Sequence, residues 1–566
     1  MKLHLDPRTK LFLILLCVLS AVFAPNLYFQ FALVILIGLL AAFSGKWQYA
    51  LRGIIAYALI CVFTVWCMGV LSGTWRTMFV AFLGLVHKVY ACGMLAGLVI
   101  STTKVGEFLS AMARLHIPKK LTIPIAVMLR YLPTIQEDWH YIKDAMRLRD
   151  VSPTLWGFLK APALTVNCIY VPLLTAASKA ADELSIASVT RGIETPHLPY
   201  QHSDAGGRFS RTGSICGVSY WGDRMEGGGR MIEFQNVSFS YPDSANGGLK
   251  HIDLTIPDGQ CVLLCGRSGC GKTTLTRLIN GLIPQFFVGE LSGQILLDGE
   301  NLAELPMYRI AEKVGSVFQN PRTQFFNVDT DSEIAFGMEN EAVPQEQMMR
   351  RVAETAKALH IENLLGRNIF ALSGGEKQKI AFASVYAMSP QVYLLDEPSS
   401  NLDMTAIGEL REHLRLIKSQ GKTVIVAEHR LYYLTDVADR IIYLENGRIA
   451  GDFTLKQFAA LSAEKRQSMG LRAIDLQEEK PLFAAVSKQP PVLELQNVAL
   501  AYKKQAVLSN ISLQATPGDI IAVVGHNGAG KTTFSRALCG LHKETTGAYL
   551  WNGKTQKMKE RMKRSY

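Results

Sequence analysis

The first two hundred residues of the chain alternate long apolar runs with short charged stretches. Residues 11–44 contain no charged side chain, and further apolar runs cover residues 53–72, 78–100 and 156–177. A helix needs roughly 20 apolar residues to cross the hydrocarbon core of a membrane. The pattern therefore predicts five or six membrane-spanning helices rather than the buried core of a large soluble helical domain.

The charges in this half of the chain agree with a membrane location. Residues 1–200 carry 18 Lys and Arg against 9 Asp and Glu, within a net charge of +11 for the 566-residue chain. A nucleic-acid-binding protein can have the same excess, but here the cations flank the apolar runs, as they do on the cytoplasmic side of membrane proteins. We therefore expect contact with membrane lipid and no nucleic acid. The ten cysteines form no CxxC pair, so we expect no disulfide framework and a reducing compartment.

A soluble part follows the last apolar run. Residues 197–230 are rich in Gly, Ser and Arg and are predicted to be a linker, because such a composition cannot bury a core. Residues 231–460 read as one α/β domain. Residues 461–491 are charged and contain Pro, which predicts a second linker. Residues 492–541 then repeat residues 231–282 step by step.

These patterns predict a multidomain protein. Residues 1–196 form an all-α polytopic membrane domain, residues 231–460 form an α/β P-loop domain, and residues 492–566 form a partial second P-loop domain.

The first P-loop domain contains the phosphate-binding sequence GRSGCGKTT between a hydrophobic run and a helical pattern. Glycines let the backbone N–H groups of such a loop turn toward phosphate oxygens at the start of a helix. The lysine is expected to reach the β- and γ-phosphates of ATP, and the first threonine to bind Mg²⁺. The residues predicted to bind nucleotide here are Gly266, Ser268, Gly269, Gly271, Lys272, Thr273 and Thr274.

Further motifs supply the groups that ATP hydrolysis needs. The hydrophobic run VYLLDE places Asp396 to hold Mg²⁺ and Glu397 to polarise an attacking water. The sequence LSGGEKQ offers hydrogen-bond donors to a γ-phosphate from Ser373, Gly374 and Gly375. With SSNLD and AEHR downstream, the set predicts an ATPase that uses ATP and Mg²⁺.

The order of these motifs resembles the nucleotide-binding domain of ABC transporters, over about 230 residues. The resemblance implies that Tyr241 stacks on adenine and that Gln319 contacts both the γ-phosphate and Mg²⁺. It also implies that His429 contacts the γ-phosphate and that Asp403 communicates between paired domains. In this family, the phosphate loop of one domain closes on the LSGG sequence of another.

The membrane half resembles the T component of energy-coupling factor (ECF) transporters in the stretches LDPRTKLFL, LRYLPTIQEDWHYIKDAMRLRD and PLLTAASKAADELSIASVTRGIE. That family has two cytosolic coupling helices, each ending in a short arginine motif that docks on an ATPase. The matching residues are Arg149 and Arg191, although the first match keeps only the arginine. The stretch NPRTQFFNVDTDSEIAFGMEN resembles the ATPase groove that receives these helices, and Glu333 within it is a candidate partner for an arginine.

The resemblance implies the energising module of an ECF-type importer of a vitamin or transition metal. Its substrate would be captured by a separate membrane protein, the S component. The expected location is a prokaryotic cell membrane, crossed several times, with the ATPase domains in the cytoplasm. The alternative is an ABC exporter half-transporter, which has the same domain order but usually a longer membrane domain.

The second phosphate loop, GHNGAGKTT, leads to a different expectation. Its predicted nucleotide-binding residues are Gly525, Gly528, Gly530, Lys531, Thr532 and Thr533. The sequence stops at Tyr566, before any equivalents of Gln319, LSGG, the DE pair and His429. We expect this copy to bind phosphate weakly without hydrolysis.

A complete second ATPase domain would then come from another chain or from a missing C-terminal part. Three explanations stay open, in this order: a truncated or frame-shifted coding sequence, pairing of the first ATPase domain with another chain or a second copy of this one, and a regulatory stub.

Overall fold

The structure is a computed structural model that describes residues 7–24, 26–70, 72–103, 119–149, 161–195, 230–242, 248–321, 324–477, 489–502, 505–543 and 546–564, with residues 112, 151 and 154 singly. The chain divides into two compact units, residues 1–129 and 130–566. Nearly all of the predicted linker 197–230 lies outside the described residues, and the predicted domain boundaries stay a prediction.

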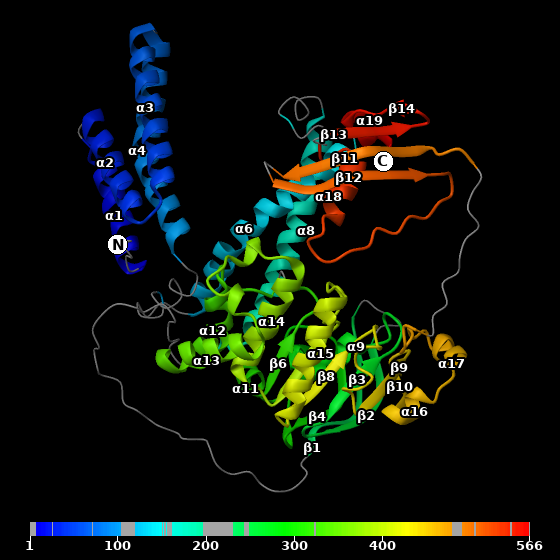
Figure 1. The fold of residues 1–566 in the computed structure, drawn as a ribbon. Helices are drawn as coiled ribbons and strands as arrows, with labels where there is room; N and C mark the ends of the chain where they lie inside the picture. The colour runs from blue at the N-terminus through cyan, green and yellow to red at the C-terminus, as the bar shows by residue number, and fades with distance from the viewer. Residues whose placement is uncertain are drawn as a thin grey trace, which may run out of the picture. The chain divides into compact units, whose positions relative to one another are not determined.

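The first unit is helical. Its helices are α1 (Pro7–Val22), α2 (Leu27–Phe43), α3 (Trp47–Val70) and α4 (Gly73–Thr102), drawn in blue in Figure 1. Small residues let these helices approach closely, as in other membrane bundles. The Tyr49 hydroxyl donates to the Met94 carbonyl at 2.9 Å, and a Cβ on Gly97 would lie 2.5 Å from that hydroxyl oxygen. Among the described helices, α3 and α4 are long and apolar enough to cross a membrane, so the expected total of five or six spans stays a prediction.

The second unit begins within α6 (Lys119–Leu148) and continues through α8 (Pro162–Val189) into the first P-loop domain. The last turn of α8 and the loop after it are buried against this domain, as the site below shows. The helices of the domain are α9 (Lys272–Ile279), α10 (Leu282–Gln285), α11 (Met307–Lys313), α12 (Thr330–Asn340), α13 (Gln345–Ala358), α14 (Gly374–Met388), α15 (Met404–Ser419), α16 (Leu455–Ala459) and α17 (Ala463–Ser468), with 3-10 turns η2 (Glu362–Leu364) and η3 (Ile369–Ala371).

Two sheets build this domain. An antiparallel sheet has the order β2-β1-β4-β5, and a six-stranded sheet has the order β10-β9-β3-β8-β7-β6. In the second sheet every neighbouring pair is parallel except β10 and β9. The bounds are β1 (Arg230–Ser240), β2 (Gly248–Pro257), β3 (Cys261–Cys265), β4 (Glu290–Leu297), β5 (Glu300–Asn301), β6 (Val314–Val317), β7 (Val392–Asp396), β8 (Thr423–Ala427), β9 (Arg440–Glu445) and β10 (Arg448–Thr454).

The parallel strands carry the motifs at their carboxyl ends. Strand β3 is buried along its whole length between β8 and β9, and the phosphate loop follows it. Strand β7, two strands away, ends at Asp396. Continuous apolar runs are typical of strands covered on both faces, so CVLLC and VYLLD are placed as the sequence predicts.

Part of the predicted linker 461–491 folds onto this domain. Helix α17 lies within it, and Met469 after the helix is buried in the core of the domain. The Arg267 guanidinium donates to the Ser468 carbonyl at 2.8 Å. This segment is therefore packed at least to Met469, because its apolar side chain finds a place in the core.

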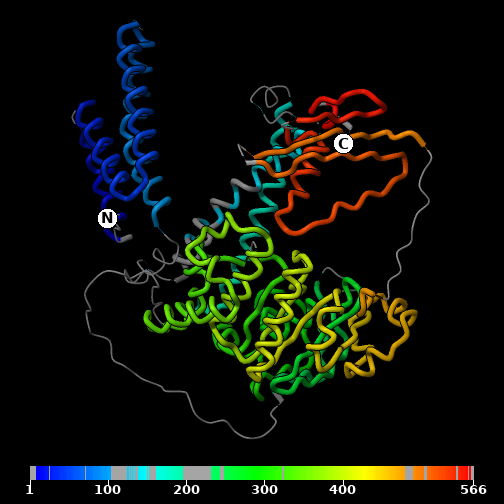
Figure 2. The backbone as a smooth tube through the Cα atoms, viewed as in Figure 1, coloured from blue at the N-terminus to red at the C-terminus, as the bar shows by residue number. Residues whose placement is uncertain are grey.

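The second copy forms an antiparallel sheet of order β12-β11-β13-β14, with α18 (Lys531–Leu538) and α19 (Met558–Arg564). Its strands are β11 (Leu493–Tyr502), β12 (Gln505–Ala515), β13 (Thr546–Trp551) and β14 (Lys554–Thr555). Residues 520–524, which correspond to β3, form no strand, and Figure 2 shows an open loop between β12 and α18. In the described part of this copy, no equivalents of β8 and β9 are present to pair with that segment.

Candidate functional site

The first phosphate loop connects β3 to α9. Lys272 is the first residue of α9 and is buried, and its Nζ donates to the carbonyls of Gly266 at 3.0 Å and Arg267 at 3.2 Å. Gly271 caps the helix with φ of 110°, a conformation that favours glycine. A Cβ on Gly266 would lie 2.3 Å from the Leu444 carbonyl oxygen. Only glycine fits here, because the start of the loop lies directly against the end of β9.

Three predicted catalytic side chains meet beside this loop. Gln319 Nε2 donates to Glu397 Oε2 at 2.7 Å, and His429 Nε2 lies 3.2 Å from Glu397 Oε1. Glu397 follows β7 with a positive φ of 45°, an uncommon conformation for a side chain of this kind. Strained backbone of this sort is often found at functional sites. The structure thus brings together residues that are up to 110 positions apart in the sequence.

Asp396 is the last residue of β7 and lies behind this cluster. Burial raises the pKa of its carboxyl to about 6, and the nearby Glu397 charge adds to the rise, while the Thr273 hydroxyl, Arg277 and Lys272 oppose it. Its Oδ1 atom is buried without a hydrogen-bond partner among the described residues. Burial and the charge of Lys272 lower the pKa of His429, which keeps the imidazole neutral near pH 7.

Tyr241 lies just after β1, beside α9. Its hydroxyl is 3.4 Å from Thr274 Oγ1 and accepts a hydrogen bond from Arg277 Nη1 at 3.1 Å. The guanidinium of Arg277 also stacks over the Phe287 ring at 3.9 Å. The tyrosine predicted to contact adenine is therefore at the phosphate loop, and Arg277 ties it to the second turn of α9.

The LSGG sequence begins α14. Ser373 is the N-cap and forms a capping box with Glu376, which fixes the start of the helix. A Cβ on Gly375 would lie 3.5 Å from Asn527 Nδ2 in the second phosphate loop. The LSGG sequence of the first domain is thus next to the phosphate loop of the second copy.

Asp403 reinforces the same contact. Its carboxylate accepts a hydrogen bond from the Asn527 backbone N–H at 2.8 Å, and Asn527 Nδ2 donates to the Asn401 carbonyl at 3.0 Å. The backbone N–H groups of Asn527 and Ala406 hold the pKa of the Asp403 carboxyl below its usual range. The second loop is folded locally: Lys531 Nζ donates to the carbonyls of Gly525 at 2.6 Å and His526 at 2.8 Å.

The two predicted coupling arginines have different surroundings. Arg191 is 2% exposed and forms an ion pair with Glu333, which is fully buried. The other carboxylate oxygen of Glu333 accepts from the Phe326 and Asn327 backbone N–H groups at 2.9 and 2.7 Å. Glu333, the partner that the sequence suggested, is therefore present. Arg149, by contrast, is exposed beyond the end of α6.

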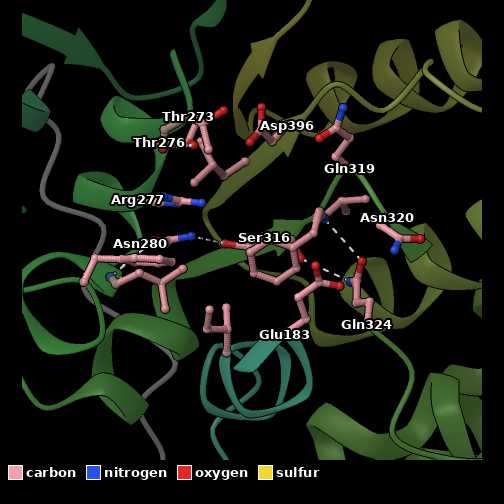
Figure 3. Close-up of a pocket in the computed structure, with 16 residues that line it drawn as sticks. Glu183, Thr273, Thr276, Arg277, Asn280, Ser316, Gln319, Asn320, Gln324 and Asp396 are labelled. Carbon is pink, nitrogen blue, oxygen red and sulfur yellow. Dashed lines mark hydrogen bonds between the residues drawn. The ribbon is translucent and has the colours of Figure 1, made fainter. Parts of the chain in front are cut away.

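Sequence reasoning missed a cavity of about 170 Å³ beside the first site. Figure 3 shows Glu183 of α8 entering it from one side, with Thr273, Gln319 and Asp396 on another. Glu183 lies in the stretch that resembles a coupling helix, but it belongs to no motif. Only the packing of α8 against the P-loop domain brings its carboxylate near the nucleotide-site residues.

Comparison with known proteins identifies the same two parts. Residues 249–400 and 508–565 match the ABC transporter family, and residues 1–200 match the Cobalt transport protein family. The chain is 51% identical over 342 residues to a "Putative ABC transporter ATP-binding protein" of Treponema denticola, across 59% of this chain and 70% of that protein. A second protein of the same description and organism is 40% identical over 330 residues, across 57% and 67%.

The chain belongs to the family of ABC transporter ATP-binding proteins. A solved structure titled "Structure of cbiO1 from clostridium perfringens: Part of the ABC transporter complex cbiONQ" is 28% identical, with a TM-score of 0.38, and covers 41% of this chain and 91% of its own. This ABC protein binds and hydrolyses ATP. Its membrane transport component precedes the ABC segments, which confirms the assignment as an ECF-type fusion.

Proposed function

We propose that this chain is the energising module of an ECF-type importer, which uses ATP hydrolysis to take up a transition metal or a vitamin through a separate S component. The observation that carries the proposal is the burial of Arg191 against Glu333. Arg191, just after the end of α8 in the transport component, is buried in the ATPase domain beside Glu333. Such a pair transmits movement between α8 and the ATPase domain, because separating the two buried charges would cost a large free energy.

At the first site, the residues have complementary roles in this proposal. Lys272 leaves its loop carbonyls to bind the β- and γ-phosphates, and Tyr241 stacks on the base. Glu397, held by Gln319 and His429, orients the attacking water. The remaining loop residues supply backbone N–H groups to the phosphates.

The buried, unpaired Oδ1 of Asp396 and the hydroxyl of Thr273 suit a hard cation such as Mg²⁺. With the amide oxygen of Gln319, they would hold it, and the ion would neutralise charge on the β- and γ-phosphates. The LSGG residues serve a different nucleotide. Gly375 lies next to Asn527 in the loop of the second copy, so we expect an ATP bound at Lys531 to contact Ser373, Gly374 and Gly375.

The location and partners follow from the same proposal. The transport component lies in a prokaryotic cell membrane, and the ATPase domains are cytoplasmic. An S component on another chain binds the substrate, and a complete second ATPase domain faces the first phosphate loop. Cobalt is the first substrate to test, since the matching family is described by cobalt transport.

The test is uptake of labelled Co²⁺ into proteoliposomes that contain the full chain, a candidate S component and a complete ATPase partner. We expect Glu397→Gln to lower MgATP hydrolysis by about 100-fold or more while ATP binding persists. Glu354→Gln, at an exposed position of α13, is the matched control. We expect Arg191→Ala to abolish uptake, with Arg350→Ala, 81% exposed on α13, as its control. Hydrolysis that survives in Glu397→Gln would contradict the catalytic assignment, and uptake that survives in Arg191→Ala would contradict the coupling role.

A further inference from the structure

The second turn of each P-loop helix carries an arginine at the same position of the repeat. The helices read KTTLTRLI in α9 and KTTFSRAL in α18, so Arg277 and Arg536 correspond. In the second copy, Arg536 forms an ion pair with Asp144 of α6. An acidic residue near the end of the first coupling helix thus contacts the helix that begins at a phosphate loop.

The first copy has an equivalent pair of charged residues, an acid on α8 and the arginine on α9, which line one cavity. Glu183 and Ile186 of α8 line the cavity of about 170 Å³ together with Thr276 and Arg277 of α9. Figure 3 shows the carboxylate of Glu183 and the guanidinium of Arg277 on this cavity, each from its own helix. On α8 the acidic residue lies one turn before Ile186, which also borders the cavity.

The carboxylate of Glu183 is poorly satisfied where it stands. Its Oε2 atom is buried without a hydrogen-bond partner in the described part of the chain, and its Oε1 lies 3.8 Å from Lys179 Nζ. A buried acceptor without a donor is unfavourable. Arg277 is the guanidinium on the same cavity, and no carboxylate ion pair is found for it among the described residues.

Arg277 connects this cavity to the nucleotide site. Its Nη1 donates to the Tyr241 hydroxyl at 3.1 Å, and α9 begins with Lys272 and Thr273. A rotation of the arginine toward Glu183 would release the hydroxyl of Tyr241. It would also fix the second turn of α9 against α8.

We propose that Glu183 is a positioning residue for the first ATP site: it pairs with Arg277 across the cavity, as Asp144 pairs with Arg536, and so links α8 directly to the P-loop helix. The link is separate from the Arg191–Glu333 pair. It rests on the proposed function, since it assigns ATP to the loop before α9. Because the pair forms as Tyr241 is released to contact the base, ATP binding and the pairing favour each other.

The test is a double-mutant cycle on the full chain in lipid nanodiscs with a complete ATPase partner. The variants are Glu183→Gln, Arg277→Gln and the double variant, and the control is Asp182→Asn, at the exposed neighbouring position of α8. The KM and kcat for MgATP are measured, with equilibrium binding of a fluorescent ATP analogue in a Lys531→Ala background.

We expect Glu183→Gln to raise the KM for ATP and the dissociation constant of the analogue by about 3- to 10-fold, the size of a typical coupling between sites, with kcat nearly unchanged. In the Arg277→Gln background the same change should have no further effect. The swapped pair Glu183→Arg with Arg277→Glu should recover part of the affinity, a result that a merely structural role would not give.

Two results, each with an active wild-type chain, would overturn the inference and leave the proposed function standing. In the first, Glu183→Gln changes the KM and the dissociation constant no more than Asp182→Asn does. In the second, the free-energy effects of Glu183→Gln and Arg277→Gln add in the double variant. If Glu183→Gln does not fold, Glu183→Asp, which keeps the charge, must retain the wild-type KM. A wild-type chain that neither binds nor hydrolyses MgATP would overturn the proposed function and this inference together.

Discussion

The two phosphate loops of this chain have nearly the same sequence and very different surroundings. The strand before the first, β3, is buried between β8 and β9. The corresponding residues before the second form no strand, and Ile520 and Val524 are 98% and 87% exposed. Yet in both loops the lysine begins a helix and donates to loop carbonyls, and the residue before it has a positive φ.

The comparison shows which features of the motif are local and which depend on strands from distant parts of the chain. The local geometry of the positive-φ glycine, the lysine and the first helical turn is the same in both copies. A parallel strand buried on both faces needs neighbours from distant parts of the chain. The residues proposed for catalysis follow β6, β7 and β8 of the same sheet. The same P-loop can therefore be well formed as a loop and lack the groups that hydrolyse ATP.

The largest expected difference between the copies is in backbone hydrogen exchange. We expect the amides of residues 261–265 to exchange at least about 1,000-fold more slowly than those of residues 520–524, because only the former lie within a paired, buried strand. Hydrogen–deuterium exchange with mass spectrometry on the full chain measures both segments in one experiment. Equal protection would show that residues 520–524 are paired in solution.

The second prediction concerns hydrolysis. Lys272→Ala should reduce MgATP hydrolysis by about 100-fold, whereas Lys531→Ala should change it by less than about 3-fold. The first loop lies beside Glu397, Gln319 and His429, and the second has no such group of its own in the described residues. Initial rates with a complete ATPase partner decide this. A comparable loss in both variants would mean that the second loop is needed for turnover at the first.

The third prediction places the same methyl group in each loop. Gly266→Ala should destabilise the first domain by about 2–4 kcal/mol, because its Cβ would lie 2.3 Å from the Leu444 carbonyl oxygen. Gly525→Ala should cost about 1 kcal/mol from backbone strain, since the nearest atom to its Cβ is Ala529 Cβ at 3.4 Å. Midpoints of denaturant unfolding, followed by domain-specific proteolysis, compare the two. If both cost the same, the first loop must relax away from β9.

The smallest effect is a pH dependence in a part of the first copy that has no counterpart in the second. Burial, with a contribution from the Glu312 charge, raises the pKa of Glu341 from 4.5 to about 7. The folded state therefore binds the proton more tightly, and the stability that this contributes is lost as pH rises from about 4.5 through 7.

Glu341→Gln should accordingly raise the melting temperature by a few degrees at pH 8 and leave it unchanged near pH 4.5. Glu354→Gln, at an exposed site, should have no effect at either pH. A stabilisation by Glu341→Gln that does not depend on pH would show that the carboxyl is not protonated in the folded protein.

Much of the first site could be predicted from sequence because its residues occur in motifs. The loop before Lys272 and the DE pair at the end of β7 lie where a parallel sheet puts them. The meeting of Gln319, Glu397 and His429 followed from the family resemblance and could not be measured without the fold. The pairing of Arg191 with Glu333 was suggested by the resemblance of the two segments to a coupling helix and its groove, together with their opposite charges.

Other features depend on packing that a single sequence does not encode locally. The repeat predicts that residues 520–524 behave like β3, but they are exposed because no equivalents of β8 and β9 pair with them in the described part of this copy. The segment around Met469 has the composition of a linker, but Met469 is buried in the core of the domain and Leu471 and Ile474 pack against that core. Glu183 and Asp144 look like ordinary charged positions of a helix until their arginine partners are placed beside them.

The burial of Arg191 has a consequence for which ATPase domain the end of α8 can contact. An ATPase groove without an acid at the position of Glu333 would leave a desolvated guanidinium uncompensated, at a cost of about 3–5 kcal/mol. That cost corresponds to a preference of more than 100-fold for the ATPase domain of this same chain over a domain that lacks the acid. The buried pair can thus keep the end of α8 on its own ATPase domain and disfavour its exchange for another one.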